Sequence, residues 1–336
     1  MSTTPIEARE KRIIPDRLGT PFRRMLASWE VLLFCVAVLI FIANSLASPY
    51  FLDAWNLSDA TFNFTEKAMI AFAMALLIIA GEIDLSVAAI IALASTAMGY
   101  AVQMGVGTPG LVAIGITTGL ACGAFNGFLV AALRLPSIVV TLGMSFVWGG
   151  LAVLILPAPG GQAPEWIRAI MTSKPPIMPM AIVASILIAV FSHLLIMRSS
   201  FGVVLRGVGG NARSVERAGW SIIRARAAVY ALAAFFAILA GIALVGLTTA
   251  ADANIALRYT LLSIAGVILG GGEFVGGRVS PIGAVIGALT LTLAGSFLSF
   301  LRISPDWQIG AQGAILIIVL ALRLLLNRFE ARRTRR

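Results

Sequence analysis

Residues 230–251 read YALAAFFAILAGIALVGLTTAA, and the only ionisable group in this run is the phenol of Tyr230. An α-helix rises about 1.5 Å per residue, so roughly 20 apolar residues cross the ~30 Å hydrocarbon core of a bilayer. The run is therefore long enough for one membrane crossing, and several other stretches of the chain have the same character.

The composition of the whole chain agrees with this first stretch. Of the 336 residues, 59% are hydrophobic and 12% are charged, whereas a soluble domain carries about 25% charged residues. Only helices and closed barrels satisfy their backbone groups inside lipid. The apolar runs are continuous rather than alternating, which favours helices over a barrel. The sequence therefore predicts an all-α polytopic membrane protein.

We expect about ten transmembrane helices, in two halves of five. An odd number of crossings in each half would insert the second half upside down relative to the first, a recurring plan in transporters. The expected spans are 29–48, 66–81, 85–104, 110–133, 137–156, 177–197, 228–249, 259–272, 280–301 and 308–326.

Basic residues test this count, because they gather on the cytoplasmic side of membrane proteins. Eighteen of the 25 fall in three blocks, namely six in the arm before residue 25, six between 198 and 226, and six after residue 322. Ten crossings put all three blocks on one side. We therefore predict cytoplasmic termini, an N-terminal arm at 1–28, a transmembrane domain at 29–326 with a cytoplasmic coupling loop at 198–227, and a basic tail at 327–336.

The net charge of +10 does not predict nucleic-acid binding, because no stacking platform or binding motif accompanies the basic blocks. Two cysteines, Cys35 and Cys122, and the single histidine, His193, give no disulfide framework and no metal cluster. The sequence contains no nucleophile–base pair and no cofactor loop. We therefore expect a protein that is not an enzyme, with no metal and no cofactor.

A stripe of glycines at four-residue spacing runs along the expected span 110–133. Such a stripe lets another helix approach closely, and helix packing is its expected role. Asn126 lies beside the stripe and could tie two helices together or face a polar path. The glycines are Gly115, Gly119, Gly123 and Gly127.

The segment GEIDLS at 81–86 interrupts a long apolar stretch with two acids. Buried acids are costly in a membrane, so these must face water, a partner or a helix end. Asp84 or Ser86 could cap the next helix, where negative charge meets the helix dipole. Alternatively, the break could lie beside a translocation path, and both interpretations stay open.

The segment GGNARSVERAGW at 209–220 is the most unusual polar part of the chain. Gly209, Gly210 and Asn211 can start a short helix, and Gly219 can end it. This helix could simply lie on the inner membrane surface, or it could dock a cytoplasmic protein.

Five blocks in this order resemble the ribose-type permease family of bacterial ABC importers for monosaccharides. They are AGEIDLSVAAIIALAS at 80–95, NGFLVAALRLPSIVVTLGMSFVWGGLA at 126–152, VGGNARSVERAGW at 208–220, ILGGGEFVGGRVSPIGAVIGA at 268–288, and Trp307-Gln308 with Gly313. The chain departs from the family pattern at Glu82, where glycine is usual, at Gly149, where arginine is common, and at Glu273-Phe274.

The resemblance implies a permease in the bacterial inner membrane that brings a monosaccharide or related small polyol into the cytoplasm. It implies three kinds of partner: cytoplasmic ABC ATPase subunits, a periplasmic sugar-binding protein and a second permease subunit. It also implies candidate residues. Asp84, Ser86, Asn126 and Thr141 would line or shape the path, and Gly209, Gly210, Asn211, Arg213, Glu216, Arg217 and Gly219 would couple to the ATPase.

Two other functions remain open at this stage. A branched-chain amino-acid permease has a similar layout but would bind a zwitterion. An ion-coupled secondary transporter would need an ion site within the spans, for which Glu82 and Asp84 are the only candidates.

Overall fold

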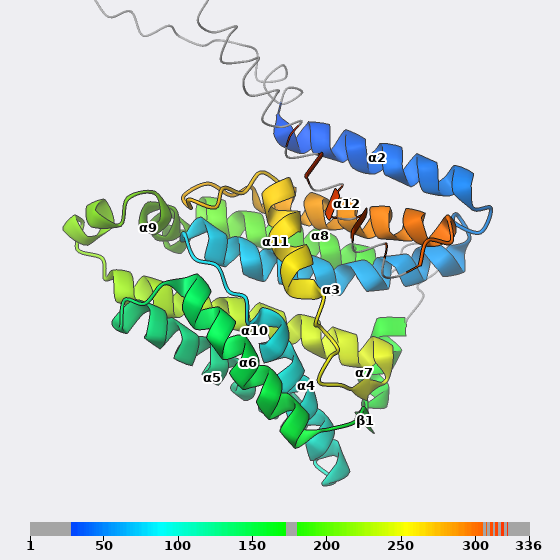
Figure 1. The fold of residues 1–336 in the computed structure, drawn as a ribbon, viewed down its shortest axis with the longest axis horizontal. Helices are drawn as coiled ribbons and strands as arrows, with labels where there is room; N and C mark the ends of the chain where they lie inside the picture. The colour runs from blue at the N-terminus through cyan, green and yellow to red at the C-terminus, as the bar shows by residue number, and fades with distance from the viewer. Residues whose placement is uncertain are drawn as a thin grey trace, which may run out of the picture.

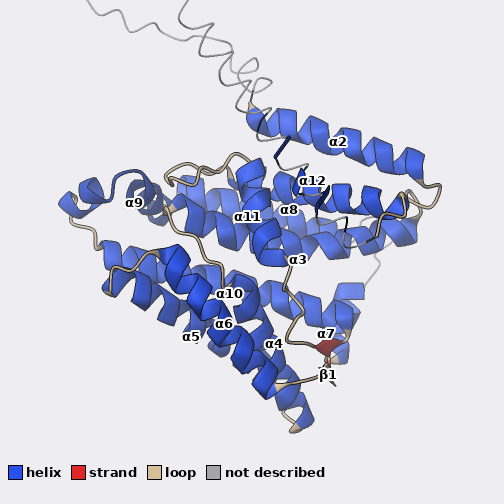
Figure 2. Ribbon diagram, in the orientation of Figure 1, coloured by secondary structure: helices blue, strands red, loops and turns tan. Residues whose placement is uncertain are grey.

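A computed structural model of the chain describes residues 28–172 and 180–304, together with isolated positions between 307 and 321. Helices make up most of the described part (Figure 2). They are α2 (Trp29–Ala47), α3 (Ala54–Ile79), α4 (Val87–Gln103), α5 (Thr108–Ala132), α6 (Ser137–Ile155), α7 (Glu165–Thr172), α8 (Met180–His193), the π-helix η1 (Leu194–Arg198), α9 (Ser200–Arg217), α10 (Ile222–Thr248), α11 (Tyr259–Leu269) and α12 (Pro281–Phe300). Two short strands, β1 (Gly160–Gln162) and β2 (Ala250–Ala251), pair antiparallel.

Each of the first nine expected spans overlaps a helix of the described part. Most of the tenth, 308–326, lies outside the described residues, as do the tail at 327–336 and all of the arm except Ser28. Five described helices are long and apolar enough to cross a bilayer: α2, α5, α6, α10 and α12. The pair α8/η1 and α9, bent by 69°, would make a sixth. These helices fit the predicted all-α multi-pass membrane protein, and the number ten stays a prediction.

The helices form two neighbouring groups (Figure 1). One contains α4, α5, α6 and α10, and the other contains α2, α8 and α12. Helix α3 joins them, because it contacts α10 on one side and α8, α11 and α12 on the other. Helices from the two expected halves thus pack against one another, as α10 does on α5 and α12 on α2.

Helix α3 is the centre of the fold because its second part is apolar on every face. Every residue from Ile70 to Ala80 is at most 1% exposed, and a helix that is hydrophobic all round belongs in the interior. The ring of Phe72 packs edge-on against Phe236 of α10 and Phe191 of α8, with centroids 4.6 Å and 6.2 Å apart. Helix α3 is therefore held between helices of both groups.

Two segments between the expected spans contain regular structure. The segment after α6 holds β1 and α7, and β1 is fixed by pairing Gly160 with Ala251. Most of the range 198–227 is also helical. Helix α9 occupies 200–217, and α10 starts at Ile222, six residues before the expected 228.

Candidate functional site

The break between α3 and α4 is organised by the carboxylate of Asp84. Its Oδ1 accepts hydrogen bonds from the Ser86 N–H at 2.7 Å and from the Ser86 hydroxyl at 2.6 Å. This is the local turn that aspartate side chains favour. Ser86 stands at the N-cap position of α4, but its hydroxyl donates back to Asp84 and makes no capping bond to the helix. Asp84 is 2% exposed and Ser86 is fully buried.

Asn126 extends this network to the neighbouring helices. Its side-chain Nδ2, on α5, donates to the Ser86 hydroxyl at 2.7 Å. Its Oδ1 accepts from the indole Nε1 of Trp148, on α6, at 3.4 Å. The break is therefore joined to two helices by side chains that are distant in sequence.

Thr141 holds the same break from α6. Its Oγ1 accepts from the Leu85 N–H at 3.0 Å and lies within hydrogen-bonding distance of the carbonyls of Ser137 (2.8 Å) and Ile83 (3.2 Å). The side chain of Thr141 is fully buried. The four residues expected to line or shape a path thus meet around one break, where all are enclosed by protein. Their part in a path stays a prediction.

Glu82, one of the departures from the family pattern, has a partner that the sequence did not reveal. Its Oε1 lies 2.8 Å from Nε of Arg226, near the start of α10, and the glutamate side chain is 5% exposed. An opposite charge at this distance stabilises a carboxylate that would be costly to bury alone. Arg226 is one of the six arginines of the central basic block, but nothing in the spacing of that block distinguishes it from the others.

Helix α9 consists of two helical pieces joined at Asn211. The backbone of Asn211 is extended (φ −156°, ψ 86°), and its Oδ1 accepts from the Ser214 N–H at 3.2 Å, as at a helix N-terminus. At the other end Gly219 takes φ +87°, while the N–H groups of Gly219 and Trp220 donate to the carbonyls of Glu216 and Val215. This is a Schellman ending. The short helix expected between Asn211 and Gly219 is therefore present.

The short helix presents its charges outward. Val215 is buried against Val204 and Val208 of the first piece, whereas Arg213, Glu216 and Arg217 are exposed. The first piece continues through Gly209 and Gly210, which the sequence placed at a helix start. Gly209 lies inside the helix for a packing reason, whereas a β-carbon on Gly210 would meet nothing within 4 Å.

Three segments meet through glycines at one place, which we call the glycine junction. A β-carbon on Gly209 would contact the Ile79 carbonyl and lie 2.5 Å from the Gly277 nitrogen, and one on Gly276 would lie 2.7 Å from Gly81 Cα. The Gly277 N–H also donates to the Ile79 carbonyl at 2.8 Å. Because backbone meets backbone, Gly209 and Gly276 accept only glycine. The junction residues are Gly81, Gly209, Gly210, Gly276 and Gly277.

The glycine stripe of α5 lies against α10 and α4. A β-carbon on Gly123 would come within 2.5 Å of Ala234 Cβ and 2.8 Å of the Tyr230 carbonyl. Gly119 meets Ile238, Gly127 meets Tyr230, and Gly115 meets the side chain of Met98. The glycine stripe of α5 and the apolar run at 230–251 are thus two sides of one helix contact.

Metal chemistry has no support among the described residues. No group of three or more histidine, cysteine, aspartate or glutamate side chains comes together there. Within the same part of the chain both cysteines are free thiols, with Cys35 exposed and Cys122 buried.

Residues 56–320 match the protein family described as "Branched-chain amino acid transport system / permease component". The chain belongs to this family. Among curated proteins it is similar to the autoinducer 2 import system permease LsrD of Salmonella typhimurium, with 26% identity over 90% of this chain and 93% of the relative. It is 27% identical to the ribose import permease RbsC of Bacillus subtilis over 96% of this chain and 98% of the relative. It is also 27% identical to a probable ABC transporter permease, YphD of Escherichia coli, over 91% and 92% of the two chains. No solved structure matches.

Membership decides the class of protein. The chain is a permease component of an ABC import system and a multi-pass membrane protein. It is a transport subunit and not an enzyme, since ATP hydrolysis in such a system belongs to a separate subunit. The family description names branched-chain amino acids, whereas the named substrates of these relatives are autoinducer 2 and ribose.

Proposed function

We propose that this permease brings a monosaccharide or a related small polyol into the cytoplasm. The observation that carries the proposal is the likeness, along nine-tenths of the chain or more, to permeases named for ribose and autoinducer 2 import. A branched-chain amino-acid substrate is less well supported, because none of these relatives is named for one and the Ile83–Ser86 segment follows the ribose-type pattern.

The proposal includes a topology. The chain would cross the bacterial inner membrane ten times, as two inverted halves of five, with both termini and the coupling loop at 198–227 in the cytoplasm. The arm at 1–28 and the tail at 327–336 would then carry cytoplasmic positive charge. In this arrangement the Gly81–Ser86 break, helix α9 and the Gly270–Arg278 link all lie at the cytoplasmic ends of their helices.

The proposed partners follow from the family. Two ATPase subunits would dock on the cytoplasmic side, a periplasmic sugar-binding protein would deliver solute on the other, and a second permease subunit would complete the path. The second subunit could be another copy of this chain or a sibling.

The glycine junction supports a route for the coupling between ATPase and path. The short helix that begins at Asn211 would contact the ATPase, and any shift of α9 would press on Gly81 and Gly276 through backbone contact. From Gly81 the chain leads directly to the Asp84 network. Movement of the break would then change the helix ends that Asn126 and Thr141 hold, and in this way open or close the path.

Transport by purified importer in proteoliposomes tests the function. We expect uptake of D-ribose or another uncharged polyol that depends on ATP and on the binding protein and survives an uncoupler. Uptake by the permease alone, driven by a proton or sodium gradient, would show a secondary transporter instead. Uptake of leucine but of no polyol would assign the substrate to the amino-acid class.

Charge reversal tests the docking surface. The Arg213→Glu/Arg217→Glu double variant is expected to retain much less ATPase in a pull-down, while the permease itself stays folded, because both side chains are exposed. Arg224→Glu is the matched control, since Arg224 is also exposed but lies beyond the short helix, near the start of α10. If Arg224→Glu lowers the amount of retained ATPase as much as the double variant does, docking responds only to net charge and the short helix is not the contact.

A further inference from the structure

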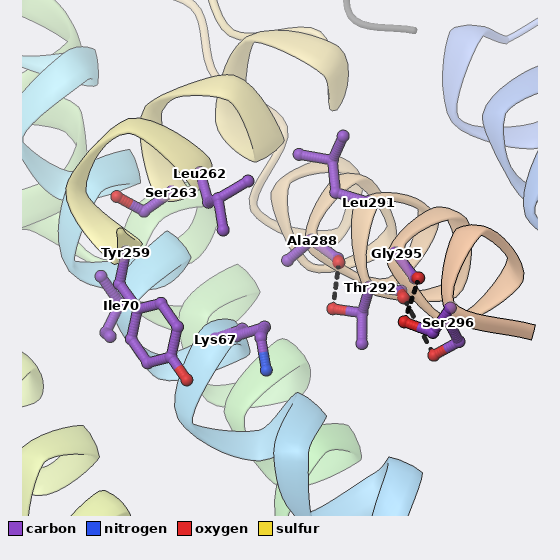
Figure 3. A pocket seen from close by; sticks show the side chains of 11 residues that line it. Lys67, Ile70, Tyr259, Leu262, Ser263, Ala288, Leu291, Thr292, Gly295 and Ser296 are labelled. Atoms are coloured by element: carbon purple, nitrogen blue, oxygen red, sulfur yellow. Dashed lines mark hydrogen bonds between the residues drawn. The ribbon is translucent and has the colours of Figure 1, made fainter. Parts of the chain in front are cut away.

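A polar pocket of about 260 Å³ lies between α3, α11 and α12, and no sequence motif pointed to it (Figure 3). Its volume is a little below the roughly 300–1,000 Å³ of pockets for drug-sized ligands, so it suits a smaller solute. Its polar lining comes from three helices: Lys67 from α3, Tyr259 and Ser263 from α11, and Thr292, Ser296 and Ser299 from α12.

Three hydroxyl groups of this lining donate to carbonyls of their own helices, which leaves their oxygens as acceptors. Thr292 donates its proton to the Ala288 carbonyl at 2.8 Å, and Ser296 donates to the Thr292 carbonyl at 3.2 Å. Ser263 donates to the carbonyl of Thr260 at 2.8 Å. Within the described part of the chain, no group donates to these three oxygens. Because each hydroxyl oxygen still has a lone pair, a ligand that carries hydroxyl donors matches this wall.

The charge in the pocket is balanced. The ammonium of Lys67 lies 2.9 Å from Oε1 of Glu66, whose side chain is fully buried, and 5.2 Å from the centroid of the Tyr259 ring. An anion would find no net positive charge here, because Glu66 already neutralises Lys67.

The pocket lies at a distance from the glycine junction along α3. Lys67 and Ile79 are twelve residues apart on α3, which is about 18 Å along a helix. In the proposed topology Tyr259 and Ser299 stand at the periplasmic ends of α11 and α12, whereas Lys67 lies near the middle of α3. A solute released by a binding protein would reach this end first.

We propose that this pocket binds an uncharged ligand with several hydroxyl groups, and that it is the first contact of the transported polyol with the permease. The second part rests on the proposed function. The pocket itself rests on the acceptor wall of Ser263, Thr292 and Ser296 and on the balanced charge of Lys67.

Cysteine protection in the assembled importer tests the pocket without using transport. Ser296→Cys is introduced into a Cys35→Ser background, and its rate of alkylation by a small maleimide is measured with D-ribose, D-glucose or xylitol. At least one of these probes is expected to slow the reaction severalfold, whereas inorganic phosphate and leucine should not. Thr117→Cys, an exposed position on α5 away from the pocket, is the control and should react equally with or without each probe.

Several results would overturn the proposal. They are an unreactive Ser296→Cys, a rate of alkylation that none of the three probes changes, and protection by phosphate instead of a polyol. An apolar cavity adjoins the pocket along α12, where Thr292 and Ser296 line both. Protection by added phosphatidylglycerol alone would therefore assign the pocket to a lipid headgroup and reject the polyol.

Uptake kinetics separate this proposal from the proposed function. Thr292→Val removes one acceptor at nearly constant shape, and the lost hydrogen bond should raise the half-saturating solute concentration about threefold to tenfold. Thr117→Val, on α5 away from the pocket, should change neither the half-saturating concentration nor the basal ATPase activity. Normal ATP-driven polyol uptake with an unchanged half-saturating concentration in Thr292→Val would reject the pocket while leaving the importer function intact.

Discussion

Gly209→Ala is expected to reduce solute uptake about tenfold or more, since a penalty of about 1.4 kcal/mol already shifts an equilibrium tenfold. The added methyl group would contact the Ile79 carbonyl and lie 2.5 Å from the Gly277 nitrogen and 3.1 Å from the Ala80 carbonyl carbon. All of these are backbone atoms and cannot rotate away. Overpacking of this kind costs about 1–3 kcal/mol and occasionally more, and here we expect the upper end. ATP-driven uptake in proteoliposomes measures the loss.

The neighbouring glycine is the matched control for folding. A β-carbon on Gly210 would meet nothing within 4 Å, and alanine favours a helix over glycine by up to about 1 kcal/mol. Gly210→Ala should therefore keep or raise the thermal unfolding midpoint in detergent, whereas Gly209→Ala should lower it. Equal midpoints for the two variants would mean that α9 does not press on the break, and the proposed coupling route would fail.

The glycine junction marks how far the sequence can predict this site. Hydropathy placed the helices well, because an apolar stretch of membrane length has few other structures available. The short helix from Asn211 to Gly219 was also predictable, because a capping asparagine and a left-handed glycine are local signals. The sequence singled out the glycines at 81, 209 and 276 in three separate motifs. Nothing local says that they touch, since their contact depends on how α3, α9 and the link before α12 pack.

The same limit applies to the polar residues. Asp84, Ser86, Asn126 and Thr141 were predicted as a group only through the family resemblance, and the structure brings all four to one break. The partner of Glu82 and the pocket around Lys67 were missed. Arg226 is one arginine among six, and the pocket serines resemble ordinary helix residues whose hydroxyls bond to the preceding turn. Their significance comes from tertiary neighbours, which composition and spacing do not encode.

Ser86→Ala is expected to destabilise the permease by about 3 kcal/mol, because two buried polar groups each lose a partner at a cost of about 1–3 kcal/mol. Asp84 would keep only the bond from the residue 86 N–H, and the amide of Asn126 would lose its acceptor. The break between α3 and α4 would then lose its connection to α5. Denaturant unfolding in detergent, followed by tryptophan fluorescence, measures the stability change.

Ser95→Ala provides the control, because Ser95 lies on the same helix, α4, and is equally buried. Its hydroxyl has no hydrogen-bond partner among the described residues. Removing it leaves no group unsatisfied, so Ser95→Ala should be neutral or stabilising by roughly 1 kcal/mol. If both variants lose the same stability, the loss reflects only a missing hydroxyl oxygen, and the Asp84 network does not hold the break. A large loss confined to Ser86→Ala would instead support the network as the element through which movement at the junction reaches α5 and α6.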